Sequence, residues 1–201
     1  MTEPTSTQVK AFWKYMSEEY GSKVIPKVDA SEMIAVATFL DVTKIQSAET
    51  FMKHFTTTLG NRIYIPFEVG VASDTHDLWA QIVVCVHEHQ HIEQGQRDGW
   101  VTFGSRYLTS GSYRAGYEAE AYGCNLEMQA WRYGPSYHLE DYAERCAQGL
   151  SSYGCKPDQI EQAEQQLKLR IPVIVAGGVE TRASQRAMAW LNEHAPELAL
   201  V

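Results

Sequence analysis

The sequence predicts a mostly helical α+β fold that carries one small β-sheet. Several segments repeat apolar residues every three or four positions, which is the period of a helix with one buried face. One short segment, residues 61–67, alternates apolar and polar side chains, as a half-buried strand does. The chain has 201 residues, 44% of them hydrophobic and 21% charged, which is enough to bury a core. We therefore expect a single domain over residues 1–201.

The first third of the chain contains two segments that we expect to be helical. Apolar residues recur at helical spacing over residues 6–20, and Gly21 follows as the expected C-terminal stop. Residues 31–41 are apolar and partly β-branched, which fits either a strand or a helix. Residues 47–59 begin with a serine suited to an N-cap, and Gly60 is expected to end that helix.

The clearest strand pattern precedes the most apolar helix. Residues 61–67 place Ile63, Ile65 and Phe67 on one side of an extended chain. Pro66 has no backbone N–H to donate, so the strand is expected to lie at a sheet edge or to end there. We expect this edge strand to border the helix that comes next in the chain.

The rest of the chain reads as helices joined by short connections. A loop over residues 69–76 leads into a helix over residues 77–94, which is apolar almost all round in its first half and is followed by Gly95. Residues 99–112 are aromatic and are expected to be irregular. Further helices are expected over residues 113–133, 139–151, 157–169 and 184–193.

Charge and cysteine content exclude some classes of function. The formal net charge is −8, from 17 basic and 25 acidic residues, which is unsuited to binding nucleic acid. The four cysteines form no C-x-x-C pair; Cys146 and Cys155 could form a disulfide, but nothing requires it. The N-terminus carries no signal-peptide pattern, and the apolar runs are too short to span a membrane. We expect a cytoplasmic protein without membrane contacts.

The chemistry-bearing motif is His87-Glu88-His89-Gln90-His91, which matches H-E-x-x-H. Positions i and i+4 share one face of a helix, so His87 and His91 can reach the same metal ion. Glu88 lies beside the first ligand and can take a proton from a water molecule on the metal. The motif therefore predicts a metal-dependent hydrolase with Glu88 as its general base.

His89 interrupts this pattern, because a third histidine lies between the two ligands. It projects about 160–200° around the helix from His87 and His91. We therefore expect it to point away from the metal and to serve as a surface or loop-packing histidine.

A catalytic zinc site usually has three protein ligands and one open position. The next helical segment, residues 113–133, carries Glu118 and Glu120. These carboxylates project about 200° apart, so at most one of them can face the metal. The spacing alone leaves both candidates open.

The combination of H-E-x-x-H with a later helix carrying E-x-x-A resembles the gluzincin class of zinc metallopeptidases, and the resemblance covers roughly residues 48–133. It implies one Zn²⁺ per chain and a glutamate as third ligand, with a small residue three positions later. Glu118 with Ala121 fits that register, whereas Glu120 would place Gly123 there. The resemblance also implies that the edge strand, residues 61–67, pairs with an extended substrate.

One position departs from the gluzincin pattern. Many members of that class have an aspartate or asparagine after the alanine, where it supports a ligand histidine. This chain has Tyr122 at that position, so the support must be built differently.

Four side chains near the motif are candidates for stabilising an oxyanion or contacting substrate, although packing is the more common role for each. They are Tyr107, Tyr113, Arg114 and Tyr117. The substrate cleft is expected between the strand at residues 61–67 and the motif helix, with residues 99–112 as a lid.

We expect a zinc-dependent hydrolase, specifically a metallopeptidase that acts on a peptide or protein substrate. A non-catalytic zinc-binding interaction protein on the same scaffold is the alternative, and Glu88 argues against it because a purely structural site needs no general base. A third hypothesis is hydrolysis of a small amide or ester. Only trials with different substrates can distinguish it from peptidase activity.

Overall fold

The computed structural model describes residues 2–42, 47–135 and 137–200. It is mostly helical with one three-stranded sheet, which confirms the predicted α+β class. The α-helices are α1 (Ser6–Tyr20), α2 (Ser31–Val42), α3 (Ala48–His54), α4 (Leu78–Asp98), α5 (Trp100–Thr109), α6 (Gly111–Tyr133), α7 (Leu139–Gly149), α8 (Pro157–Val175) and α9 (Arg182–His194). The strands are β1 (Lys23–Pro26), β2 (Thr57–Leu59) and β3 (Arg62–Ile65), and the 3₁₀ turns are η1 (Lys27–Asp29), η2 (Leu150–Tyr153) and η3 (Pro196–Leu198).

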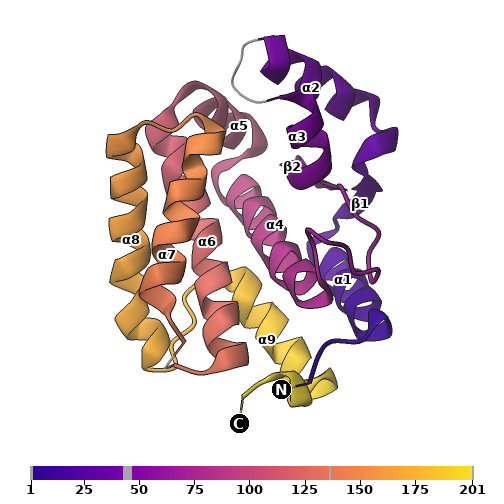
Figure 1. Cartoon of the computed structure of the whole chain (residues 1–201), viewed down its shortest axis with the longest axis vertical. Helices are drawn as coiled ribbons and strands as arrows, with labels where there is room; N and C mark the ends of the chain where they lie inside the picture. Colours follow the sequence, from indigo (N-terminus) through magenta and orange to yellow (C-terminus); the bar gives the residue numbers. More distant parts are fainter. Residues whose placement is uncertain (1, 43–46, 136, 201) are drawn as a thin grey trace.

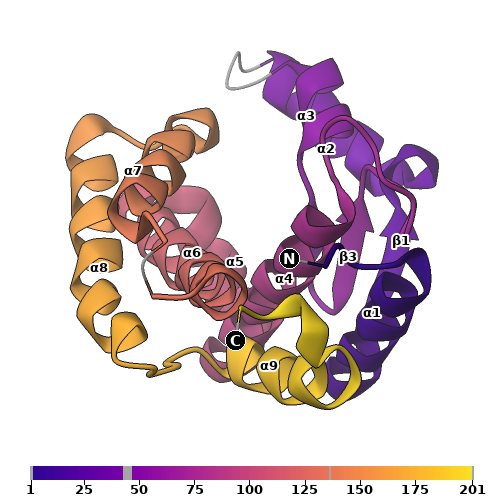
Figure 2. The same ribbon diagram turned by 60° about the horizontal axis from the view of Figure 1, so that its bottom comes forward.

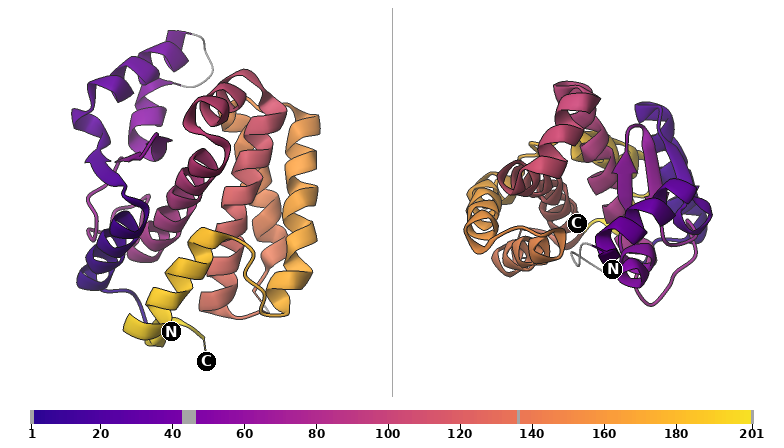
Figure 3. Two further views of the ribbon diagram at one scale, coloured as in Figure 1. Left: turned by 180° about the vertical axis from the view of Figure 1, so that it is seen from behind. Right: turned by 90° about the horizontal axis from the view of Figure 1, so that it is seen from above.

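Helix α4 runs through the middle of the molecule and packs against α1, α6 and α9 (Figure 1). On one side lie the sheet, α2 and α3; on the other, α6 packs between α4 and the pair α7–α8. Figure 2 shows these two sides as opposite arms that are joined at α4 and α9, and Figure 3 shows the same arrangement from behind and from above. We call residues 23–42 and 47–65 the N-terminal arm, and residues 111–135 and 137–175 the helical arm.

The sheet order corrects the predicted edge strand. The order is β1-β3-β2, with β3 parallel to β1 and antiparallel to β2. The strand expected over residues 61–67 is therefore the central strand, and it ends at Ile65 because Pro66 cannot extend the ladder. The edge strand that borders α4 is β2.

Strand β2 comes from a segment that was expected to be helical. Helix α3 begins after Ser47, which caps it as expected, but it ends at His54. Consecutive threonines follow, and such β-branched side chains favour extended backbone. Gly60 does not end a helix; its φ of 62° forms the turn of the β2–β3 hairpin.

Three other boundaries differ from the sequence-based expectation. Helix α4 continues through Gly95, which is a packing glycine: a Cβ there would lie 2.1 Å from the ring of Trp100. Residues 100–109 are helical rather than irregular, and α8 continues past Pro172 to Val175. By contrast, α1 spans the predicted residues and ends at the predicted glycine, and residues 31–42, left open between strand and helix, form α2.

Three clusters of buried side chains hold these elements together. The largest surrounds α4 and joins it to α1 and α9, and the second lies among α6, α7 and α8. The third is small and belongs to the N-terminal arm; it consists of Ala30, Met33, Ala37, Phe51 and Tyr64. Cys146 and Cys155 both carry free thiols. None of the described helices combines the length and the apolar character needed to cross a membrane.

Candidate metal centre

Helix α4 brings two histidines to one face, one turn apart. Its preceding turns are anchored by Ile82 and Val86, which are fully buried in the largest core cluster. His87 and His91 follow directly and meet Glu118 of α6. These three residues are only 8%, 7% and 1% exposed, so the group lies beneath the surface.

The distances within this group suit a shared metal ion. Glu118 Oε2 lies 3.5 Å from His87 Nε2, and Glu118 Oε1 lies 3.5 Å from His91 Nε2. One ligand atom of each residue lies within 4.8 Å of the other two. Ligands of a tetrahedral zinc ion are about 3.4 Å apart, so the side chains need little adjustment. Within the described part of the chain, this is the one group of His, Cys, Asp and Glu residues that could hold a metal ion.

Side-chain amides hold both imidazoles by their outer nitrogens. His87 Nδ1 donates to Asn125 Oδ1 at 3.2 Å, and His91 Nδ1 donates to Gln94 Oε1 at 2.9 Å. The Gln94 amide is itself fixed, because its Nε2 donates to the carbonyl oxygen of Tyr117 at 2.8 Å. A proton on Nδ1 leaves the lone pair on Nε2, the nitrogen that faces Glu118. Both rings are thus oriented as metal ligands.

Asn125 supports the ligand histidine His87, the role that the gluzincin pattern gives to position 122. It lies seven residues after Glu118, about two turns along the same face of α6. Tyr122 contributes differently: its ring packs edge-on against His87, with centroids 4.9 Å apart. The seven-residue spacing is visible in the sequence and could have identified Asn125.

Charge in this group is concentrated on Glu118. Burial alone would raise the pKa of its carboxyl group, but His91, His87 and a hydrogen bond from Tyr107 lower it to about 2. Burial likewise opposes a charge on His87, yet Glu118 raises the pKa of that imidazole overall. The buried carboxylate is therefore ionised and attracts positive charge.

One oxygen of this carboxylate also lacks a hydrogen-bond donor. Glu118 Oε1 accepts from the phenol of Tyr107 at 2.6 Å, whereas Oε2 has no hydrogen-bond partner among the described residues. An unpartnered, buried, ionised oxygen is costly unless a cation binds it. This oxygen and the free Nε2 lone pairs of the two histidines together make the group fit a divalent metal ion.

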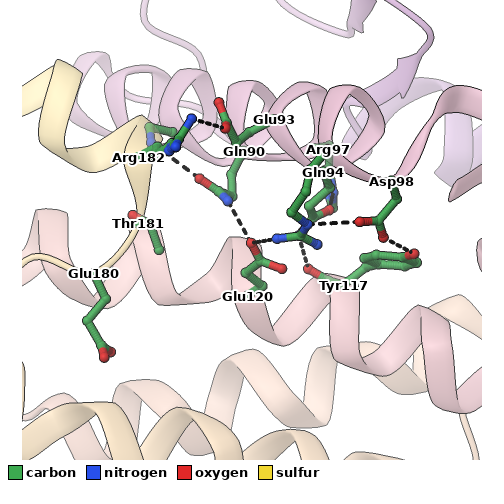
Figure 4. A network of polar contacts seen from close by, with 12 residues as sticks. Gln90, Glu93, Gln94, Arg97, Asp98, Tyr117, Glu120, Glu180, Thr181 and Arg182 are labelled. Carbon is green, nitrogen blue, oxygen red and sulfur yellow. Dashed lines mark hydrogen bonds and ion pairs between the residues drawn. The ribbon is translucent and has the colours of Figure 1, made fainter.

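Glu120, the other candidate ligand, points elsewhere. Its Oε1 accepts hydrogen bonds from Gln90 Nε2 and Arg97 Nη1, both at 2.8 Å (Figure 4). These contacts lie on a different side of α4 from the two histidines. The structure thus places Glu118, and not Glu120, at His87 and His91.

The same side of α4 borders a cavity of about 520 Å³. Its charges balance, since the three arginines and three glutamates that line it form three ion pairs. Figure 4 shows two of these pairs, Arg97–Glu120 and Arg182–Glu93. The lining residues are Gln90, Glu93, Gln96, Arg97, Glu120, Arg170, Glu180, Thr181 and Arg182. The candidate metal ligands do not line it.

Glu88 lies next to the metal group without belonging to it. It is 5% exposed, and its Oε2 accepts a hydrogen bond from Thr58 Oγ1 at 2.6 Å. Thr58 belongs to the edge strand β2, so the strand that borders α4 also orients this carboxylate. Sequence analysis missed Thr58, because nothing local distinguishes it from Thr56 and Thr57, which precede it.

His89 points away from the metal group, as its helical position predicts, and of the two expected roles it is a packing residue and not a surface one. It is fully buried, with Nδ1 donating to the carbonyl oxygen of Cys85 at 2.7 Å and Nε2 accepting from Ser22 at 2.9 Å. Its ring packs on Trp13 and Tyr20 of α1. Burial lowers the pKa of His89 to about 4.

The four candidate oxyanion residues separate into one at the site and three away from it. Tyr107, on α5, donates to Glu118 and so covers the metal group. Tyr117 donates to Asp98, and Tyr113 is 51% exposed. Arg114 donates to three backbone carbonyls and fixes the α5–α6 connection and η2. The segment expected to form a lid, residues 99–112, consists mostly of helix α5.

Tyr153 of η2 is a further residue near the site that sequence analysis missed. Burial, then the neighbouring Tyr122 and Glu118, raise the pKa of its phenol well above the usual value. It reaches the site because η2 packs on α7 and α8 and its Tyr153 carbonyl accepts a hydrogen bond from Arg114 of α6, which no local pattern predicts.

Comparison with known proteins adds no relative: no family model matches this chain, and neither a curated protein nor a solved structure matches it.

Proposed function

We propose that this protein is a zinc-dependent hydrolase, and specifically a gluzincin-type peptidase. The observation that carries the proposal is the buried group of His87, His91 and Glu118, in which both imidazoles are held by their outer nitrogens and Glu118 keeps an unpartnered oxygen. Burying an ionised carboxylate costs free energy, and a cation bound in the group would offset that cost.

Zinc is the metal that best suits these ligands. Two imidazoles and one carboxylate are the ligand set of many catalytic zinc sites, and three protein ligands leave one coordination position open. Zinc in such a site supplies Lewis acidity, which polarises a carbonyl group and makes water acidic near neutral pH.

The protein's own residues divide the remaining work. Glu88 accepts the proton of the attacking water and delivers it to the departing nitrogen, and Thr58 holds its carboxylate in one orientation. Tyr107 binds Glu118 and keeps it directed at the histidines. A peptide laid along the edge strand β2 would pass beside Glu88, which supports a peptide or protein as the substrate.

The alternative is a zinc-binding interaction protein without turnover. The observation that favours it is the low exposure of His87, Glu88 and His91, all below 10%, since a structural metal needs no route for substrate. Glu88 is the discriminating residue: an interaction protein has no use for a carboxylate that β2 holds in place beside the metal.

The test is elemental analysis of the purified protein after zinc has been supplied, followed by a peptide-library digest analysed by mass spectrometry. We expect about one zinc per chain and cleavage that disappears in Glu88→Gln with zinc retained. Glu120→Gln is the matched control, because it makes the same change on a carboxylate that does not face the histidines, and it should keep both zinc and cleavage.

Each negative outcome has a distinct meaning. Zinc without cleavage of peptides, esters or small amides would favour the interaction protein. If the protein takes up no zinc or other divalent metal, both the hydrolase and the zinc-binding interaction protein are ruled out.

A further inference from the structure

Access to the metal group is restricted on two sides. On one side, Thr58 of β2 contacts Glu88. On the other side, Tyr107 of α5 contacts Glu118, and Arg114 holds η2 beside Tyr107 because it donates to the carbonyl oxygens of both Tyr107 and Tyr153. A substrate that follows β2 to the metal must therefore pass between β2 and η2.

Among the residues that the structure describes, one aromatic contact joins these two sides. The rings of Phe55 and Tyr153 meet edge to face, with centroids 5.5 Å apart at 73°. Phe55 lies between α3 and β2, three residues before Thr58, and Tyr153 ends η2. Both rings are half-buried, whereas His87 and His91 are buried. The contact is therefore nearer to solvent than the metal ligands are, and it adjoins the strand whose Thr58 contacts Glu88.

The Phe55 side has the means to move as a unit. Helices α2 and α3 pack mainly on each other around the small cluster, whereas Ile63 and Ile65 anchor β3 in the largest core cluster. Lys27 ties Phe55 into this unit, since its Nζ donates to the carbonyl oxygens of Phe51 at 2.9 Å and Phe55 at 2.7 Å. Regions with a small separate core open more readily than a central core does.

We propose that Phe55 and Tyr153 form an aromatic gate over the metal group, and that movement of α2 and α3 away from η2 opens it to admit an extended chain. The two arms, which face each other in Figure 2, touch at this pair. The substrate that the gate admits rests on the proposed function, but the gate itself is a property of the metal-free protein and can be tested without turnover.

The test measures how fast diethyl pyrocarbonate modifies His87 and His91 in metal-free protein, with mass spectrometry resolving each histidine. The exposed His194 serves as the internal reference for reagent activity. We expect slow modification in the wild type and a rate about tenfold higher in Phe55→Ala, the factor that an aromatic contact contributes to a closing equilibrium. The reference rate should not change.

Matched variants separate a gate from general loosening. Met52→Ala removes a half-buried side chain from the same small cluster without touching Tyr153, and it should react like the wild type. Tyr153→Ala removes the contact from the opposite arm and should match Phe55→Ala, which keeps the test usable if one variant folds poorly. Tyr153→Phe keeps the ring and should stay slow.

Equal rates in Phe55→Ala, Tyr153→Ala and the wild type would overturn the gate. So would a Met52→Ala rate as high as that of Phe55→Ala, because it would show that any loosening of the arm exposes the site. Zinc binding is measured separately, so the gate and the proposed function can fail independently.

Discussion

The two sides of α4 use the same residue type for opposite purposes. On the side facing α6, His87 and His91 meet an ionised carboxylate, and Glu118 raises the pKa of His87 despite its burial. On the side facing α1, His89 meets a carbonyl and a hydroxyl among aromatic rings, and burial lowers its pKa to about 4. All three histidines lie within five consecutive residues.

This difference shows that the neighbouring elements, and not the helix, decide what a histidine does. A buried imidazole whose two nitrogens are matched by neutral groups is stable as a neutral packing residue. An imidazole whose outer nitrogen is fixed and whose inner nitrogen faces a carboxylate is arranged to share a cation.

The largest expected difference between the two sides is in metal binding. His87→Ala and Glu118→Ala each remove one of three ligands, so zinc affinity should fall by about a thousandfold or more, with no zinc surviving purification. His89→Gln keeps a polar group at a position that does not face Glu118 and should retain about one zinc per chain. Elemental analysis and competition with a zinc-binding dye measure both. Loss of zinc in His89→Gln, in a variant that still folds, would contradict the division.

The second difference concerns stability in acid. Because the folded-state pKa of His89, about 4, lies below the unfolded value of about 6.5, the unfolded chain binds more protons between these values. Stability from this residue is therefore complete above about pH 6.5 and is lost as pH falls towards 4, by up to about 3 kcal/mol. Urea unfolding of metal-free wild type and His89→Gln at a series of pH values isolates this contribution. Parallel profiles for the two proteins would show that His89 does not carry it.

Removal of the supporting amides should weaken zinc binding less than removal of a ligand. Asn125→Ala and Gln94→Ala free the outer nitrogens of His87 and His91, and zinc affinity should fall about 10–100-fold. Gln96→Ala changes an exposed glutamine on the same helix and is the matched control for Gln94→Ala. Zinc affinities come from the same dye competition. Unchanged binding in both amide variants would mean that the histidines need no such support.

The smallest effect is expected at Glu88, the proposed general base. Thr58→Val removes the donor to Glu88, so turnover of a cleaved peptide should fall about tenfold while zinc content stays unchanged. Thr56→Val is the control, because Thr56 Oγ1 is buried and has no hydrogen-bond partner among the described residues. Steady-state kinetics on the peptide found in the library digest give the comparison. A similar loss in both variants would trace the effect to β2 packing and not to Glu88.

Local sequence determined the parts of this protein that depend on neighbours within one or two helical turns. Helical periodicity places His87 and His91 on one face with Glu88 beside them, and it turns His89 away from the metal group. The capped ends of α1 and the start of α4 at Asp77 follow from residues with strong local preferences.

Tertiary structure decided what depends on residues far apart in the chain. The spacing left Glu118 and Glu120 open, and the packing of α6 on α4 turned the first towards the histidines and the second towards Arg97. The edge strand was misplaced because sheet order depends on which strands meet, and the alternation of residues 61–67 fits a central strand as well as an edge. Helical period is a local property of the backbone, whereas strand order, burial of His89 and the Phe55–Tyr153 contact arise only when distant segments pack together.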